Sequence, residues 1–264
     1  MNTSGQKGTR PPPPLNSETL ERIYHAIVTP ETISYCNREQ AIAFIEDISE
    51  HFNEPSESTL KKNFSAFLET NPTEMELWAS LQKFASLLRE AGKTWILDRH
   101  NTRVSGSEFR AFTDEVNARG DGERRVVFVA ENPYFMILRE AMYLRRKGYR
   151  AYLVTKDPLP KTLSGTFAKA FDAVVDARRN PPLLGGLLAK LRPDIFHVQC
   201  FMWNYALARQ VMEIKKDAAV VCEFYDITSI YADRDTLLTN WSPAMVDFDF
   251  AMETYILQNA DAII

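Results

Sequence analysis

The sequence predicts an α/β fold: a Rossmann-like, doubly wound parallel sheet preceded by an all-helical N-terminal region. From residue 125 onward, strand-length apolar runs alternate with helical segments. This alternation is typical of βαβ units joined by right-handed crossovers. Before residue 120, apolar residues recur at helical spacing instead. We therefore expect a helical region of unknown role over residues 16–120 and a Rossmann-like domain over residues 125–264.

The N-terminal region contains several local signals. Residues 1–15 are polar and carry four consecutive prolines, which predicts a disordered arm stiffened by polyproline II. Apolar spacing within 37–54 predicts a helix. Residues 73–76 read Thr-x-x-Glu, a capping box that opens a helix ending at Gly92. Residues 105–108 form a second such box, which predicts another helix start.

The elements of the Rossmann-like domain follow from the same alternation. We expect strands at 125–130, 149–155, 172–176, 194–199 and 218–224, with a further strand beginning at 262. We expect helices near 134–147, 162–170, 182–191, 203–216 and 247–259.

Composition excludes several classes of protein. Hydrophobic content of 45% and charged content of 25% are ordinary for a globular protein, and a net charge of −4 gives no support for a nucleic-acid partner. Cys36, Cys200 and Cys222 are too few and too scattered for a disulfide framework or a zinc site. No apolar run approaches the length of a transmembrane segment. We expect a cytoplasmic protein without a metal.

The first strand-to-helix corner, residues 130–134, lacks the Gly-x-Gly-x-x-Gly pattern of dinucleotide-binding folds, and no Walker sequence occurs. This weakens a relationship to reductases or epimerases. A receiver domain is also disfavoured, because Glu131 stands alone where clustered acids are needed and no lysine follows the fifth strand.

Ligands of open parallel sheets bind outside the carboxyl ends of the strands. Polar residues at those ends are therefore our candidate substrate-binding residues. Trp203 and Asn204 also open a helix, whose first amides lack partners within the helix and can bind a ligand. The candidates are Glu131, Asn132, Gln199, Trp203 and Asn204.

The fifth strand ends in Tyr225 and Asp226, our candidate catalytic residues. Asp226 could act as a general base for an acceptor hydroxyl, or it could cap the following turn. His197 lies inside the fourth strand and is either a core histidine or part of a site. Cys200 is a poor candidate nucleophile, because the sequence shows neither a base nor a cause for a lowered thiol pKa.

Five stretches taken together resemble the N-terminal domain of GT-B glycosyltransferases, in particular the glycosyltransferase family 4-like acceptor domain. Residues 125–131 and 144–149 resemble the family's first strand and its L-x-x-x-G-[HY] helix end. Arg192-Pro193-Asp194-Ile195-Phe196-His197-Val198 is similar to its [RK]-P-D-[IV]-[IVF]-H-[VA] strand. Residues 220–226 are similar to the strand ending in H-D, with Tyr225 in place of the histidine, and residues 259–264 to A-D-x-[IV]-[IV].

This resemblance implies a GT-B acceptor half that would orient a sugar or glycan acceptor, with Asp226 and Tyr225 near the reacting hydroxyl. It implies no cofactor, since the nucleotide-sugar donor is a co-substrate bound mainly by a second Rossmann domain. That donor domain is not in the 264 residues. We therefore expect a chain truncated before it and inactive on its own, so that whether the chain is an enzyme stays open.

The alternative is a non-catalytic interaction protein that uses a Rossmann-like scaffold and the acidic helical region. The aromatic residues of the helical region could cover either a private core or a partner, and a core is the better expectation. These residues are Phe44, Phe52, Phe64, Phe67 and Trp78.

Overall fold

The computed structural model describes residues 11–28, 38–51, 55–118, 120, 122–156, 164–177 and 184–264. The helices are α1 (Ser17–Val28), α2 (Arg38–His51), α3 (Pro55–Glu69), α4 (Glu74–Glu90), α5 (Thr94–Asn117), α6 (Met136–Arg146), α7 (Ser164–Ala170), α8 (Leu184–Lys190), α9 (Tyr205–Ile214), α10 (Thr228–Tyr231), α11 (Arg234–Leu237) and α12 (Pro243–Asn259). The strands are β1 (Arg124–Ala130), β2 (Tyr149–Thr155), β3 (Ala173–Asp176), β4 (Ile195–Cys200), β5 (Ala219–Phe224) and β6 (Ala262–Ile263).

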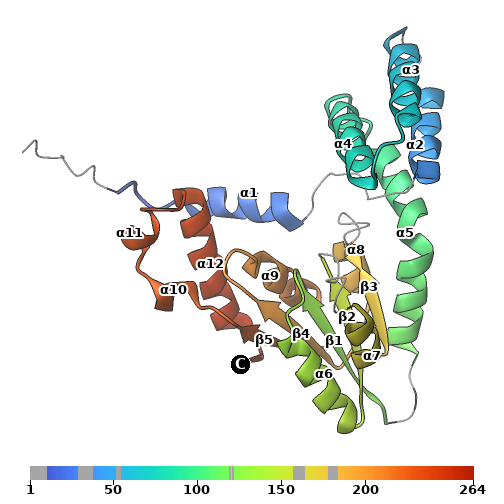
Figure 1. The fold of residues 1–264 in the computed structure, drawn as a ribbon. Helices are drawn as coiled ribbons and strands as arrows, with labels where there is room; N and C mark the ends of the chain where they lie inside the picture. Colours follow the sequence, from blue (N-terminus) through green and yellow to red (C-terminus); the bar gives the residue numbers. More distant parts are fainter. Residues whose placement is uncertain are drawn as a thin grey trace, which may run out of the picture.

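The predicted doubly wound sheet is confirmed. Six parallel strands lie in the order β3-β2-β1-β4-β5-β6 (Figure 1), which is the strand order of the Rossmann fold. The chain first builds outward from β1 to β3, then returns to β4 beside β1 and builds in the opposite direction. The order therefore reverses between β1 and β4, which is where such sheets form a crevice.

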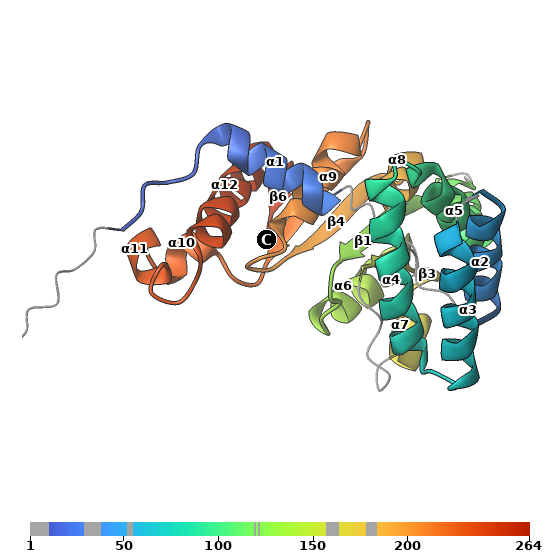
Figure 2. The same ribbon diagram turned by 90° about the horizontal axis from the view of Figure 1, so that it is seen from above.

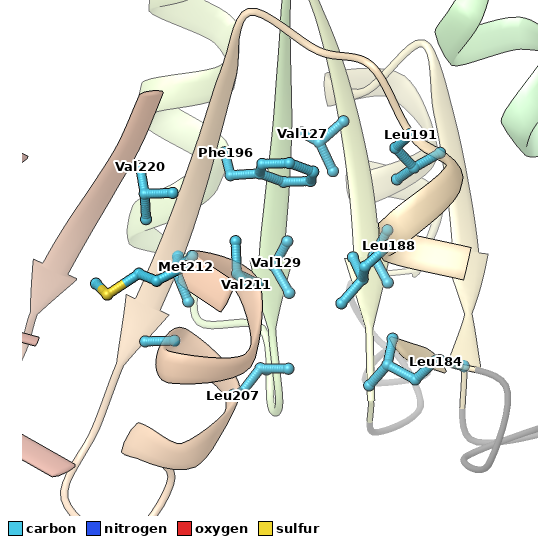
Figure 3. Close-up of a cluster of buried hydrophobic side chains, with 14 of the residues drawn as sticks. Val127, Val129, Leu184, Leu188, Leu191, Phe196, Leu207, Val211, Met212 and Val220 are labelled. Carbon is cyan, nitrogen blue, oxygen red and sulfur yellow. The ribbon is translucent and has the colours of Figure 1, made fainter. Parts of the chain in front are cut away.

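One face of the sheet carries the larger core. Val127 and Val129 of β1 and Phe196 of β4 point into it, against Leu188 of α8 and Val211 of α9 (Figure 3). Helices α1, α5 and α12 also contribute buried side chains to this cluster. The strands of a parallel sheet are apolar on both faces, so each face needs a cover of helices. Here helices cover this face along most of its width.

The opposite face carries a smaller core. Val126 and Phe128 of β1 pack with Leu153 of β2, Ile137 of α6 and Phe167 of α7. Helices α6 and α7 lead outward from β1 to β3, so right-handed crossovers place both of them on this face. The helix that packs most extensively on β4 and β5 is α9, from the other face.

Three aspartates immediately precede strands, and each satisfies an amide near the start of the neighbouring strand. Asp172 accepts a hydrogen bond from the Ala151 N–H at 2.8 Å, Asp194 from the Arg125 N–H at 2.7 Å, and Asp261 from the Val220 N–H at 2.8 Å. Each aspartate precedes an apolar strand in the sequence. The recurring Asp-apolar-apolar pattern thus has a structural cause in the ladder of the sheet.

The helical region is divided between two cores. Helices α2, α3 and α4 pack with the first half of α5 around Phe44, Phe64 and Leu81, whereas Phe109 and Phe112 in the second half of α5 join the core of the sheet. Figures 1 and 2 show α5 extending from the helical group along the sheet. Phe44 and Phe64 are therefore core residues; Phe52 and the side chain of Trp78 lie outside the described residues.

The two predicted capping boxes had different outcomes. Thr73 and Glu76 form the predicted reciprocal hydrogen bonds, and Gly92, at φ 68°, follows the end of α4. The second box, at residues 105–108, is wrong, because α5 continues through it. Burial of Ile96 and Leu97 in one core and Phe112 in the other stabilises a continuous helix, so tertiary packing overrides the local signal.

Other differences concern the C-terminal part. Helices α10 and α11 were not predicted, and α12 begins at Pro243 rather than 247, with Ser242 accepting a hydrogen bond from the Met245 N–H. Residues 1–10 of the expected arm, Cys36, and the first residues of the helices expected at 162 and 182 lie outside the described residues. No described helix is long and apolar enough to cross a membrane.

Buried Arg209 of α9 anchors α1 to the α/β domain. Its guanidinium donates two hydrogen bonds to Glu21 of α1, at 2.9 and 2.7 Å, and one to Glu213 at 2.9 Å. It lies between the rings of Tyr24, at 3.9 Å, and Tyr255, at 4.8 Å. Planarity and the fixed donor fork of arginine are needed for this combination of bidentate pairing and stacking.

We predict that Arg209→Lys lowers the free energy of unfolding by about 2 kcal/mol, because lysine keeps the charge but loses the second hydrogen bond and the stacking. Urea denaturation measures this loss, and limited proteolysis should cut the variant near α1 faster. Arg22→Lys, at an exposed position of α1, is the matched control and should unfold like the wild type. Equal stability of the Arg209 variant and the control would contradict the anchoring role.

Candidate functional site

A hollow of about 410 Å³ lies at the carboxyl ends of β1 and β4, where the strand order reverses. The β1–α6 corner contributes Glu131, Asn132 and Tyr134 to its lining, and the β4–α9 corner contributes residues 201–204. Four of the predicted substrate-binding residues are therefore brought together here: Glu131, Asn132, Trp203 and Asn204.

The polar groups around this hollow have partners within the protein. Glu131 pairs with Lys156, which follows β2, at 2.5 Å. Asn204 precedes α9, but its side chain does not cap that helix and instead accepts a hydrogen bond from the Phe201 N–H at 2.7 Å. The hollow is thus shaped by local hydrogen bonds at both corners.

Tyr225 and Gln199 flank the hollow rather than lining it. The ring of Tyr225 stacks on that of Phe201, with centroids 4.6 Å apart and planes at 12°, and meets the ring of Tyr134 edge-on at 5.4 Å. Gln199 is buried and accepts a hydrogen bond from the Tyr134 N–H at 3.3 Å. These contacts make Tyr225 and Gln199 supports for the β1–α6 corner.

Trp203 adopts a left-handed backbone conformation, with φ 74°, which is uncommon for a bulky residue and signals local strain. The main-chain N–H of Trp203 donates to Asp249 of α12 at 2.8 Å, and the Thr228 hydroxyl donates a short hydrogen bond to the same carboxylate. The ring centroids of Trp203 and Trp241 lie 4.9 Å apart. Asp249 is 2% exposed, so a buried carboxylate holds the strained corner in place.

Asp226 does not line the hollow. Its carboxylate accepts a hydrogen bond from the Tyr231 hydroxyl at 2.6 Å, and its main-chain carbonyl accepts one from Tyr205 at 2.6 Å. The expected turn cap is not formed as predicted either, because Thr228 donates to Asp249 and the Ser229 N–H donates to Glu253. Asp226 therefore holds α10 against the end of β5.

Cys200 is fully buried on the α9 side of the sheet, within the larger core. Burial raises the pKa of its thiol well above the ordinary value. A thiolate nucleophile is thus disfavoured at this position, in line with the sequence expectation.

A second group of polar residues lies on the opposite face of the sheet, beneath α6. His197 of β4 and Glu223 of β5 are each 5% exposed, and Glu140 of α6 faces them. The Nε2 atom of His197 lies 3.2 Å from Oε2 of Glu140. One ligand atom from each of the three side chains lies within 4.8 Å of the others. We call these three residues the Glu–His–Glu cluster.

Burial sets the charges of the Glu–His–Glu cluster. It lowers the pKa of His197 to about 4, so the imidazole is neutral at pH 7 and its contact with Glu140 is not an ion pair. Burial, and then the neighbouring charge of Glu223, raises the pKa of Glu140 to about 8. Burial also raises the pKa of Glu223. Two carboxyl groups this close do not both ionise readily without a cation.

Sequence reasoning missed Glu140 and did not connect Glu223 to His197. The signal was present in the strands, because side chains alternate between faces. His197 and Gln199 in β4, and Glu223 in β5, share one face, and Gln199 lies directly opposite Glu223 in the register. Polar residues at alternating positions of two neighbouring buried strands therefore indicate a polar cluster.

A cavity of about 610 Å³ opens beside the cluster, between α6 and the strands β1, β4, β5 and β6. We call it the α6 groove. Its floor is formed by Val126, Ile195, His197, Val221 and Ile264, and its α6 wall by residues that include Arg139, Glu140, Met142, Tyr143 and Arg146. Tyr143 is 59% exposed and Ile264 is 65% exposed.

Comparison with known proteins gave few matches. No family model matches the chain, and no curated protein matches it. Among solved structures, MT0777 is 17% identical, with a TM-score of 0.33 over 53% of this chain and 84% of that chain. The eIF2B delta structure from Chaetomium thermophilum is 13% identical, with a TM-score of 0.30 over 93% and 96% of the two chains. The match to the tetrameric eIF2B-beta2-delta2 complex from C. thermophilum has a TM-score of 0.28. Similarities this low carry no argument about function.

The predicted membership of the glycosyltransferases is wrong. None of the solved structures reported above, MT0777 and eIF2B subunits, is named as a glycosyltransferase, and no family model supports the assignment. With it fall the sugar acceptor and the nucleotide-sugar partner. The catalytic roles expected of Asp226 and Tyr225 lose the support of that resemblance and stay predictions. The motifs mark strand starts instead: Asp194 and Asp261 satisfy neighbouring strands, and Gly148, at φ 85°, follows a helix end. Any doubly wound sheet can use these features.

We predict a pH-dependent stability that originates at Asp249. Burial raises the pKa of Asp249 to about 6, so the folded state binds this proton more tightly than the unfolded state. Stability is then fully present below the unfolded pKa of 3.8 and decreases as the pH rises to about 6. The loss is on the order of 3 kcal/mol.

Asp249→Asn should remove the contribution of this group and so change the slope of stability between pH 4 and 6, as measured by urea denaturation at a series of pH values. Asp235→Asn, at an exposed position of α11, is the matched control and should retain the wild-type slope. A wild-type slope in the Asp249 variant would place the origin of the pH dependence elsewhere.

Proposed function

We propose that this chain is an interaction protein, in which the Rossmann-like sheet is a scaffold and the α6 groove binds an amphipathic helix of a partner protein that carries acidic residues. The observation that carries this proposal is the groove itself. Parallel sheets are ordinarily covered on both faces by helices, yet in the described part of the chain the groove lies open between α6 and the strands.

The lining of the groove supports an apolar contact. Val126, Ile195 and Val221 form its floor beside Ile264, and Met142 and Tyr143 project from α6. Met142 and Tyr143 are exposed although both have large, mainly apolar side chains. An exposed apolar patch bordered by charged residues is typical of a surface that binds another protein. A helix laid into the groove would contact the floor with one apolar stripe.

The charges at the edge of the groove favour an acidic partner. Arg139 and Arg146 line it from α6 and are exposed. The carboxyl group of Glu140 lies against His197 and Glu223 instead of pairing with these arginines. An acidic flank on the partner helix would therefore meet two guanidinium groups, which steers association and selects the orientation.

The helical group of α2, α3 and α4 is a less suitable binding surface. Its aromatic residues Phe44 and Phe64 are buried in their own core, and Phe67 and Phe84 pack against that core. We therefore assign the interaction to the sheet rather than to the helical region. The sequence has three cysteines, too few for a disulfide framework, which supports a reducing setting such as the cytoplasm.

We predict that a labelled amphipathic peptide of about 18 residues, with leucines on one face and glutamates beside them, binds the chain in a fluorescence anisotropy titration. Tyr143→Glu should weaken binding at least about tenfold, because it places a carboxylate against an apolar stripe. Ile230→Glu, at an exposed position of α10, is the matched control and should leave binding unchanged.

The charge requirement has its own test. The double variant Arg139→Glu with Arg146→Glu should lose the glutamate peptide and gain the matching lysine peptide, and raising the salt concentration should weaken both. Equal binding of Tyr143→Glu and the wild type would overturn the proposal. So would a chain that sediments as a dimer which Tyr143→Glu dissociates, since the occupant would then be a second copy.

A further inference from the structure

The Glu–His–Glu cluster is more than an acidic group at a protein surface. It combines one imidazole and two carboxylates, contributed by three different elements: α6, β4 and β5. Residues far apart in the sequence meet at one point on the sheet, because His197 and Glu223 share a face and α6 crosses over it. The cluster lies beside the α6 groove, through which a small ion can enter.

Several buried polar atoms of the cluster lack hydrogen bonds, although a hydrogen bond joins the carboxyl groups of Glu140 and Glu223. Within the described residues, neither nitrogen of His197 makes a hydrogen bond, although Nε2 lies 3.2 Å from Oε2 of Glu140, and Oε2 of both Glu140 and Glu223 also makes none. His197 and Glu223 are each only 5% exposed. Burying such groups unpaired is costly, and native structures usually satisfy them with water or an ion.

We propose that Glu140, His197 and Glu223 bind a divalent transition-metal ion, with zinc as the ion best matched to the ligands. Imidazole nitrogen and carboxylate oxygen together are ligands of zinc and its first-row neighbours, whereas magnesium and calcium take oxygen alone. A cation also resolves the proximity of two buried carboxylates, since it neutralises both at once.

The geometry needs only a small adjustment. Zinc lies about 2 Å from each nitrogen or oxygen ligand, which brings ligand atoms to within about 4 Å of one another. The present separations extend to 4.8 Å. Glu140 has a partly exposed side chain, at 28%, and can rotate toward the other two. Three protein ligands leave a fourth position, which water can occupy from the groove side.

The test is a titration of the metal-free chain with Zn²⁺ by isothermal calorimetry, without any peptide. The wild type should bind one ion per chain. Glu223→Gln and His197→Asn should each weaken binding at least about tenfold, whereas Glu115→Gln, at an exposed position on α5, should not change it. Glu140→Gln, at the partly exposed ligand, serves if the buried variants do not fold.

X-ray absorption of the zinc-loaded wild type gives an independent readout. The expected shell holds one imidazole nitrogen and oxygens, with no sulfur, because both described cysteines are buried on the other side of the sheet. Sulfur in the shell, no binding near one ion per chain, or unchanged affinity in Glu223→Gln and Glu140→Gln would each overturn the proposal. Peptide binding in the groove is measured separately, so either proposal can fail alone.

Discussion

The whole structure depends on one constraint: a parallel sheet buries apolar side chains on both faces, and right-handed crossovers decide which helices cover which face. Leading outward from β1, α6 and α7 cover one face; α8, which leads back to β4, and then α9 and α12 cover the other. The reversal between β1 and β4 opens the hollow lined by Glu131 and Trp203. The same reversal leaves the face of β4 and β5 beneath α6 partly open.

That partly open face explains why polar residues can occur inside the sheet. His197 and Glu223 would be intolerable under a tightly packed apolar helix, but here they lie beside a groove and opposite Glu140. On the covered face, the corresponding positions of the same strands are Phe196, Val198 and Cys222, all buried and apolar. The contrast between the two faces of β4 and β5 supports the site that we propose beneath α6.

The N-terminal helices are joined to this scaffold at two points of different character. Helix α5 contributes to both cores and so connects α2, α3 and α4 to the sheet without a break. Helix α1 packs Tyr24 into the larger core and is also attached through Arg209, whose guanidinium pairs with Glu21 and Glu213. Arg234 pairs with Asp247 and donates to the Pro12 carbonyl at 2.9 Å. Polar networks therefore add to the apolar packing that holds the N-terminal segment.

The sequence by itself determined the doubly wound class and most element positions, because strand and helix periods and the capping box at Thr73 are local signals. It placed Glu131, Asn132, Trp203 and Asn204 near one another, since all follow neighbouring strands. Only the tertiary structure decided that α5 runs through a false capping box, that Asp226 serves α10, and that Glu140 meets His197 and Glu223. These features depend on which elements pack together, a long-range property that no short motif encodes. The aspartates that precede the strands are likewise a general feature of parallel sheets, so the motifs that contain them resembled those of a family without showing membership of it.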